Sequence, residues 1–530
     1  MTRALSNRQI ARAALVVILG FLASGALGLI RTAVISATFG ASDALDAFYY
    51  AQRIPETIFV LVAGGALGSS FIPVFSRYLA ASDHESAWRL ASATMTLVGL
   101  LATALALIVG VLAPYFVPTL LIPHESPDVQ ALTVSLTQIM LVTTVVFSVS
   151  GLVMGILNAH QLFVLPALAP SMYNVGLIVG ALLLSRLLPT ANGEPNIYGL
   201  AWGAIVGACL HLAVQIPGLL RVGRTRFIPN WRVPGVREVI TLMIPRVLGL
   251  AVVQINFTVN ANFSSSMVEG SYTALTHAWI LLFFALGVIG QSIGAAVFPS
   301  LSALASERNM EGFKERLSSA MRGVLFLSFP ATVGLILLGR PVISLLFERG
   351  AWTPESTAGT AWALSFFALG IAGHSLLEVL SRAFYALSDT RTPVTVGSLS
   401  MLLNIGLSLI FIRLIGDPNS LSHGPFAGLA LANSLTTIGE ALALWWLLRR
   451  RIGSINDASV IDALWRALVA ALGMGAALLL ALNLLNDAGA LLNAIVGGIV
   501  GGAVFFGLSL ALGINEARTV PAMVLQRGRK

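Results

Sequence analysis

This sequence is poor in charge. Only 10% of its 530 residues are charged, whereas 57% are hydrophobic. A soluble domain carries about 25% charged residues, so a soluble protein of this composition could not cover its surface with polar groups. The composition therefore excludes a soluble globular protein, a disordered chain and a coiled coil. It predicts a membrane protein, because lipid is the solvent that tolerates so much outward apolar surface.

The chain also lacks the residues of common catalytic and metal sites. Its single cysteine, Cys209, can form neither an intramolecular disulfide nor a cysteine-based metal site. The seven histidines include no HExxH pair, and the sequence contains no Walker A motif. We therefore expect a protein that is not an enzyme, uses no ATP and needs no metal or other cofactor.

Long apolar runs fill most of the chain. A helix needs about 20 mostly apolar residues to cross a bilayer, and about fourteen such runs can be read between polar breaks. These runs predict an all-α polytopic membrane protein. The predicted spans are 12–39, 46–73, 89–117, 131–157, 163–187, 197–220, 236–263, 272–303, 317–338, 357–386, 393–415, 424–448, 459–483 and 489–513.

The basic residues are distributed unevenly between the two sets of connecting loops. One set, together with both termini, holds most of the arginines, and the opposite set holds only Arg186, Arg340, Arg349 and Arg413. Cytoplasmic loops carry the excess of positive charge, so both termini should be cytoplasmic, which requires an even number of spans. The net charge of +8 is thus interpreted as orientation charge, that is, loop charge that sets how the protein lies in the membrane. Nucleic acid is not expected as a partner.

Two stretches of the chain resemble each other. Residues 71–90 resemble residues 297–316, with Pro73 matching Pro299, and Pro166 matches Pro393 at nearly the same offset. This repeat predicts two six-helix lobes in the same orientation, at 1–220 and 236–449, a plan that in transporters places the substrate site between the halves. Two extra helices at 459–513 and a basic cytoplasmic tail at 514–530 follow the second lobe.

A few ionisable residues lie inside the first two predicted spans. Charged groups in hydrocarbon are costly, so they usually face a cavity or pair with one another. Arg31, Asp46, Arg53 and Glu56 form such a mixed cluster. It predicts either a polar cavity wall, in which Arg31 and Arg53 bind a phosphate through their planar guanidinium groups, or a closed set of salt bridges that locks the helices.

Candidates for ion coupling lie elsewhere. Glu378 and Glu440 could bind a proton or cation, although Glu378 is also spaced to form an ordinary helix ion pair with Arg382. Amides within predicted spans could contribute to a Na⁺ site or could equally form interhelical hydrogen bonds. These amides are Asn256, Asn260 and Asn404.

Several collinear motifs resemble the MurJ/MviN family of lipid II flippases, within the multidrug/oligosaccharidyl-lipid/polysaccharide exporter superfamily. The resemblance extends over nearly the whole chain. The matching stretches are LGLIRTAVISATFGASDALDAFYYAQRIP (27–55), FIPVFSRY (71–78), GILNAHQLFVLPALAPSMYN (155–174), VFPSLS (297–302), LLFERGAWT (345–353) and AFYALSDTRTPV (383–394).

The resemblance implies two six-helix lobes plus two extra helices, and export of an undecaprenyl-pyrophosphate-linked peptidoglycan precursor by alternating access. It also implies a cationic cavity that binds the pyrophosphate. Arg31, Asp46 and Arg53 match the family's residues at three positions of that site. At other positions where the family carries arginine, this sequence departs from the pattern. Those positions hold Gly25, Phe59 with Val60, and Ile280.

We therefore predict a flippase that moves lipid II from the inner to the outer leaflet of the bacterial cytoplasmic membrane, with a role in peptidoglycan biosynthesis, cell-wall biogenesis and cell shape. Na⁺ or H⁺ coupling fits this function, and its partners would be the lipid-linked substrate, membrane lipids and cell-wall synthesis proteins. A cation-coupled drug or polysaccharide-lipid exporter of the same superfamily is one alternative. A non-transporting scaffold for cell-wall assembly is another.

Overall fold

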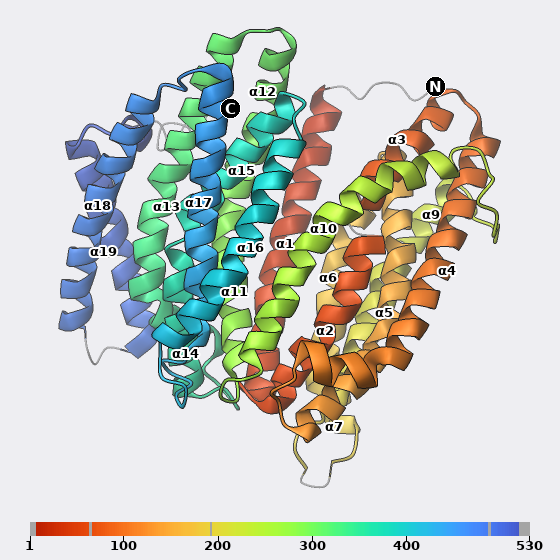
Figure 1. Cartoon of the computed structure of the whole chain (residues 1–530), viewed down its shortest axis with the longest axis horizontal. Coiled ribbons are helices and arrows are strands. Elements are labelled where there is room, and N and C mark those ends of the chain that lie inside the picture. The colour runs from red at the N-terminus through yellow and green to blue at the C-terminus, as the bar shows by residue number, and fades with distance from the viewer. Residues whose placement is uncertain (1–6, 63–65, 191–192, 486–488, 519–530) are drawn as a thin grey trace. The chain divides into compact units, whose positions relative to one another are not determined.

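The computed structural model describes residues 7–62, 66–190, 193–485 and 489–518, and these ranges contain helices and no strand (Figure 1). The α-helices are α1 (Asn7–Phe39), α2 (Asp43–Val62), α3 (Ala66–Ala80), α4 (His84–Phe116), α5 (Pro127–Ala159), α6 (Val164–Val179), α7 (Ser185–Leu187), α8 (Tyr198–Ala213), α9 (Ile216–Val222), α10 (Val236–Ser264), α11 (Ser271–Leu286), α12 (Ser292–Ser306), α13 (Met310–Phe347), α14 (Pro354–Ala368), α15 (Ile371–Ala386), α16 (Arg391–Leu414), α17 (Phe426–Ile452), α18 (Asp457–Leu484) and α19 (Gly489–Ala511). The π-helical segments η1 (Val117–Leu121), η2 (Gly180–Leu184) and η3 (Gly287–Gln291) continue α4, α6 and α11.

The helices confirm the predicted all-α polytopic membrane fold. Within the described ranges, 10 helical stretches are long and apolar enough to cross a membrane, and α14 with α15, bent by 47°, makes up to 11. The other predicted spans fall on α1, on α2 with α3, and on α10. The helix α2 is unusually polar for such a span, since it carries Asp43, Asp46, Arg53 and Glu56 within 20 residues.

The chain forms two compact units. The first comprises Met1–Gly270 and Arg349–Trp352, and the second comprises Ser271–Glu348 and Thr353–Lys530. The helix α10 packs against α2 and α3 and therefore belongs to the first unit, although the sequence repeat assigns it to the second lobe. The predicted lobes at 1–220 and 236–449 therefore stay a prediction from the sequence repeat. Part of the predicted tail, 519–530, lies outside the described residues.

Local turns recur along the predicted repeat. Four non-glycine residues with left-handed backbone, a costly conformation for them, form two matched pairs at nearly the same offset: Ser82 with Arg308 and Gln161 with Ser388. The residues that follow the first pair are both helix caps, because Asp83 accepts from the Ser86 N–H and Asn309 accepts from the Gly312 N–H. The structure therefore repeats turn and cap at the places where the sequence resembles itself.

Glycines allow α6 and α8 to cross closely within the first unit. A Cβ on Gly180 would come within 2.8 Å of the Gly203 Cα, and a Cβ on Gly207 would come within 2.7 Å of the Tyr173 carbonyl oxygen. The backbones are therefore in contact where larger side chains would separate them, as small residues permit in membrane helix pairs. This crossing holds α6 in place, and α6 contributes residues to the site described below.

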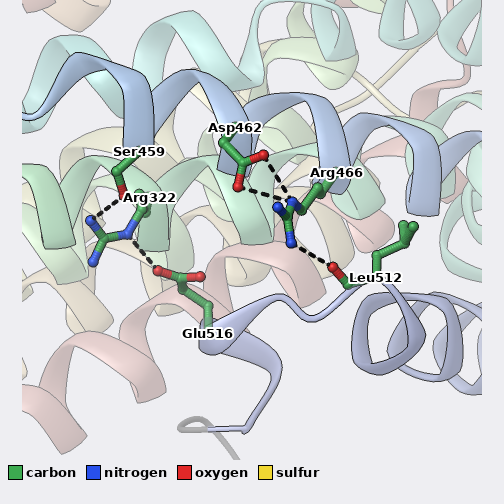
Figure 2. Close-up of polar contacts among 6 residues, drawn as sticks. All are labelled: Arg322, Ser459, Asp462, Arg466, Leu512 and Glu516. Atoms are coloured by element: carbon green, nitrogen blue, oxygen red, sulfur yellow. Dashed lines mark hydrogen bonds and ion pairs between the residues drawn. The ribbon is translucent and has the colours of Figure 1, made fainter.

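In the second unit, α18 and α19 pack against α13, and polar contacts at one end fasten the chain that follows α19 (Figure 2). The Arg322 guanidinium of α13 donates to Glu516 at 2.8 Å and to Ser459 of α18 at 3.1 Å. Both charged side chains are largely covered, with exposures of 22% for Arg322 and 14% for Glu516. Nearby, Arg466 pairs with Asp462 at 2.9 Å on an exposed face of α18.

Candidate functional site

Arg31 lies on α1, within the first unit. Its guanidinium donates to the Oδ1 of Asn174 on α6 at 3.0 Å, and the Asn174 amide donates in turn to the Ser24 carbonyl at 3.2 Å. The amide of Asn174 is neutral, so this contact orients the guanidinium without neutralising its charge. Within the described part of the chain Arg31 forms no ion pair. Arg31 is therefore a half-buried cation whose charge no carboxylate in the described residues neutralises.

Arg53 lies on α2 and is held from two sides. It pairs with Glu56 one turn later at 3.2 Å, and its guanidinium carbon lies 4.8 Å from the centroid of the Phe257 ring on α10. Arg53 is 16% exposed and Glu56 is 45% exposed. The Arg53–Glu56 pair fits the salt-bridge interpretation of the sequence, and the cation–π contact with Phe257 is one that the sequence does not reveal.

Asp46 is 3% exposed and faces backbone rather than a cavity. Its carboxylate accepts a hydrogen bond from the Gly270 N–H at 2.9 Å, which joins α2 to the segment that follows α10. Gly270 has φ +81, and a Cβ there would come within 2.8 Å of the Ala41 carbonyl oxygen, so glycine is needed for this approach. In this conformation Asp46 therefore fastens α2 to the segment between α10 and α11.

The four predicted residues nevertheless lie in one neighbourhood. The buried Tyr49 is within electrostatic range of Arg31, Asp46 and Arg53. Tyr173 on α6 is likewise within range of Arg31 and of Glu56. The structure thus brings the four residues of the predicted cluster into the neighbourhood of Tyr49 and Tyr173.

A cavity of about 340 Å³ lies beside this cluster, inside the first unit. Its size is at the lower end of ligand-binding pockets. Arg31 and Arg53 are not on its lining, but each forms a hydrogen bond with a residue that is, Asn174 or Glu56. The lining residues are Ser24, Gln52, Pro55, Glu56, Phe59, Met140, Thr143, Phe147, Pro170, Tyr173, Asn174 and His211. The wall therefore combines carboxylate, amide and aromatic groups in front of the two cations.

The positions where this sequence departs from the family pattern take different places. Phe59 lines the cavity and packs against Phe147 with ring centroids 5.5 Å apart. Gly25 is exposed on α1, Val60 is half-buried on α2, and Ile280 is half-buried on α11. Of these four residues, Phe59 is the one on the cavity lining, where it presents an aromatic ring.

The predicted ion-coupling residues fall into separate groups. Glu440 on α17 interacts with Ser400 of α16, and Asn404 donates to Thr436 on the same pair of helices at 3.3 Å. Glu378 pairs with Arg382 at 3.1 Å on α15. Both glutamates lie within electrostatic range of Tyr385.

The remaining two amides lie in the first unit. Asn260 donates to Asn256 at 3.2 Å along α10. Among the described residues, no group of three or more His, Cys, Asp or Glu side chains is arranged to hold a metal ion. The predicted coupling role of all five residues stays a prediction.

A second polar cluster joins the ends of α2, η1 and α10. Glu125, in the loop before α5, accepts a hydrogen bond from the buried Tyr50 hydroxyl at 3.2 Å. The Asp43 N–H donates to Glu269 at 3.0 Å, and both of these carboxylates lie within electrostatic range of Glu125. Burial and the Asp43 carboxylate raise the pKa of Glu125 to about 7, against the opposing effect of the Tyr50 hydrogen bond, and Glu269 adds to the rise.

This pKa predicts that the protein becomes less stable as pH rises. Below about pH 4.5 Glu125 is protonated in both states; between that value and about 7 the unfolded chain loses the proton first, so the free energy of unfolding falls. Glu125→Gln should remove this loss and be more stable than the wild type at pH 8, by on the order of 1–2 kcal/mol after solvent screening. Thermal melting at pH 5 and pH 8 measures the effect, with the exposed Glu85→Gln as control. A Glu125→Gln melt that follows the wild type at both pH values would contradict it.

Sequence reasoning missed most of the cavity lining. Asn174 belongs to a motif that carries the family resemblance, so the sequence indicated that this residue matters. It did not indicate that Asn174 contacts Arg31. His211 is an isolated histidine in an apolar run, yet the structure buries it on the lining and places its Nδ1 2.7 Å from the Ser150 hydroxyl. Residues so far apart in the chain converge only when α5, α6 and α8 pack.

Comparison with known proteins agrees with this architecture. Residues 35–497 match the family described as Lipid II flippase MurJ. The chain is 31% identical over 448 residues to the lipid II flippase MurJ of Burkholderia cenocepacia, covering 83% of this chain and 84% of that protein. It is also 31% identical to the probable lipid II flippase MurJ of Vibrio cholerae, covering 81% of each chain.

Solved structures share the fold. A lipid II flippase MurJ in an inward closed conformation aligns with a TM-score of 0.77 at 24% identity, covering 93% of this chain and 98% of that one. An inward-facing multidrug resistance MATE transporter of the MOP superfamily aligns with a TM-score of 0.67 at 15% identity, covering 84% and 99%. The family match and the relatives above 30% identity lead to one conclusion: this chain belongs to the lipid II flippase MurJ family.

Proposed function

We propose that this protein is a flippase that moves lipid II, a polyprenyl-pyrophosphate-linked peptidoglycan precursor, from the inner to the outer leaflet by alternating access. The observation that carries the proposal is Arg31, a half-buried cation whose hydrogen-bond partner Asn174 is neutral and lines a cavity. A pyrophosphate is a strong bidentate acceptor for arginine, and a guanidinium already oriented by Asn174 loses little freedom on binding it.

The cluster around Arg31 also gives Arg53 a role. Arg53 is occupied by Glu56 in this conformation, and Glu56 is the more exposed member of the pair. A pyrophosphate arriving at the cavity could displace Glu56, because it carries more negative charge than the carboxylate does. Arg31 would then bind first and Arg53 would close on the substrate, with Asp46 keeping α2 fastened to Gly270.

The remaining expectations belong to the same proposal. Both termini lie in the cytoplasm of a bacterium, the protein sits in the cytoplasmic membrane, and cell-wall synthesis proteins receive the exported precursor. Transport is coupled to H⁺ or Na⁺, and Glu378 and Glu440, which both lie near Tyr385, are the candidate proton acceptors. Asn404, Asn256 and Asn260 remain candidates for the Na⁺ alternative.

Transport of fluorescent lipid II in proteoliposomes tests the function. The purified chain is expected to make the labelled precursor accessible in the opposite leaflet, whereas protein-free liposomes keep it where it was inserted. Rescue of a bacterium depleted of its own lipid II flippase is the expected result in cells. Absence of both activities in well-expressed protein, with a family relative active in parallel, would refute the proposal. Export of a cationic dye that depends on Glu378 or Glu440 would favour the drug exporter instead.

A further inference from the structure

The segment between α9 and α10, residues 223–235, lacks regular secondary structure and is fixed to the surface of α4. The Arg226 N–H donates to the Ser92 hydroxyl and the Ile228 N–H donates to the Thr96 hydroxyl, each at 3.0 Å. We refer to residues 223–235 as the basic linker. The basic linker joins the C-terminal end of α9 to the N-terminal end of α10.

The basic linker exposes side chains that would ordinarily be covered. Phe227 is 73% exposed and Trp231 is 60% exposed. Three of its arginines and one arginine on each flanking helix are exposed as well: Arg221, Arg224, Arg226, Arg232 and Arg237. Large aromatic rings on a water-facing loop are unfavourable unless something covers them, and aromatic rings beside arginines are typical of the membrane–water interface.

These arginines are not used in ion pairs. In the described ranges none of the five pairs with a carboxylate, and the acid nearest in sequence, Glu238, pairs with Arg77 of α3 at 2.5 Å. Arg232 lies 5.5 Å from the Trp231 ring centroid. The positive charge of the basic linker is therefore available to a ligand.

Another run of arginines in this protein behaves differently. At the end of α17, Arg449 pairs with Asp457 at 3.4 Å and Arg451 pairs with Asp389 at 2.6 Å. The third, Arg450, stacks over Trp446 with its guanidinium carbon 3.7 Å from the ring centroid. Of these two runs, the one at the end of α17 uses two of its three arginines in ion pairs, whereas the basic linker uses none of its three within the described ranges.

We propose that the basic linker is a binding surface for anionic phospholipid headgroups of the adjoining leaflet. Its arginines contact the phosphates, and Phe227 and Trp231 insert among the headgroups beside them. Each arginine at an anionic surface contributes about 1 kcal/mol, and the hydrogen bonds to Ser92 and Thr96 present these side chains from a backbone already ordered. The inference is independent of the transported substrate.

Native mass spectrometry of the detergent-purified protein titrated with dioleoyl-phosphatidylglycerol tests the surface. The variant R224Q/R226Q/R232Q is compared with R449Q/R450Q/R451Q, which loses the same charge from paired or stacked arginines. We expect the first variant to bind the lipid roughly a hundredfold more weakly than wild type, since three arginines contribute about 1 kcal/mol each, and the second to bind nearly as wild type does. Melting temperatures of all three proteins establish that each is folded.

A second readout follows the aromatic part of the surface. In nanodiscs with brominated phosphatidylglycerol, the fluorescence of Trp231, taken as the difference between wild type and W231F, is expected to be quenched. Equal loss of lipid binding in both triple variants would overturn the proposal, because net charge alone would then explain it. So would phosphatidylcholine binding as tightly as phosphatidylglycerol, competition by inorganic phosphate at matched concentration, or an unquenched Trp231.

Discussion

Replacing Arg31 by alanine is expected to slow lipid II transport by roughly tenfold or more, since a hydrogen bond to a charged group contributes about 1.5–3 kcal/mol. Asn174 already holds the guanidinium at 3.0 Å, so alanine removes both the charge and its orientation. Arg31→Lys keeps the charge but not the planar fork, and it should transport at an intermediate rate. Initial rates in proteoliposomes with equal amounts of protein measure the effect.

The control for this prediction is Arg186→Ala. Arg186 is an exposed arginine of the same unit, on α7, and its loss changes the net charge equally. It should leave transport unchanged. Asn174→Ala should resemble Arg31→Lys, because the charge remains while its orientation is lost. If Arg31→Ala and Arg53→Ala both transport at the wild-type rate, the assignment of these cations to the pyrophosphate is wrong.

Gly203→Val is expected to prevent normal folding of the first unit. A Cβ on Gly203 would lie 2.5 Å from the Gly180 Cα and 2.8 Å from the Gly176 carbonyl oxygen. These are backbone atoms of a packed helix, which cannot move aside as the end of a flexible side chain could. Helices α6 and α8 would have to separate, at a cost of about 3 kcal/mol or more. The measured outcome should be a large loss of monodisperse protein and a lower melting temperature.

Gly498→Val on α19 is the matched control. No heavy atom lies within 4 Å of the Cβ that Gly498 would gain, and the substitution is chemically the same. It should leave both the yield and the melting temperature close to those of the wild type. If Gly203→Val has the melting temperature of the wild type, α6 and α8 do not cross closely enough to exclude a larger side chain.

How far the sequence could predict the site depended on the distance between partners along the chain. Arg53 and Glu56 are three residues apart on one helix, so their pairing follows from spacing. The partners of Arg31 and Asp46 are Asn174 and Gly270, and no local pattern indicates them. The sequence left a polar cavity wall and a closed set of salt bridges as alternatives, and the structure holds parts of both: Arg53 pairs with Glu56, whereas Arg31 forms no ion pair within the described residues.

The sequence by itself determined that this protein is a membrane protein, where its helices lie and that two stretches of the chain resemble each other. Those properties follow from local composition and from a self-resemblance that Ser82 and Arg308 reproduce in the backbone. The tertiary structure decided that α10 packs with the first unit, that Asn174 orients Arg31, and that the basic linker keeps its arginines unpaired whereas Arg449 and Arg451 are paired. These outcomes depend on which helices touch, and a pattern confined to one helix carries no information about its neighbour.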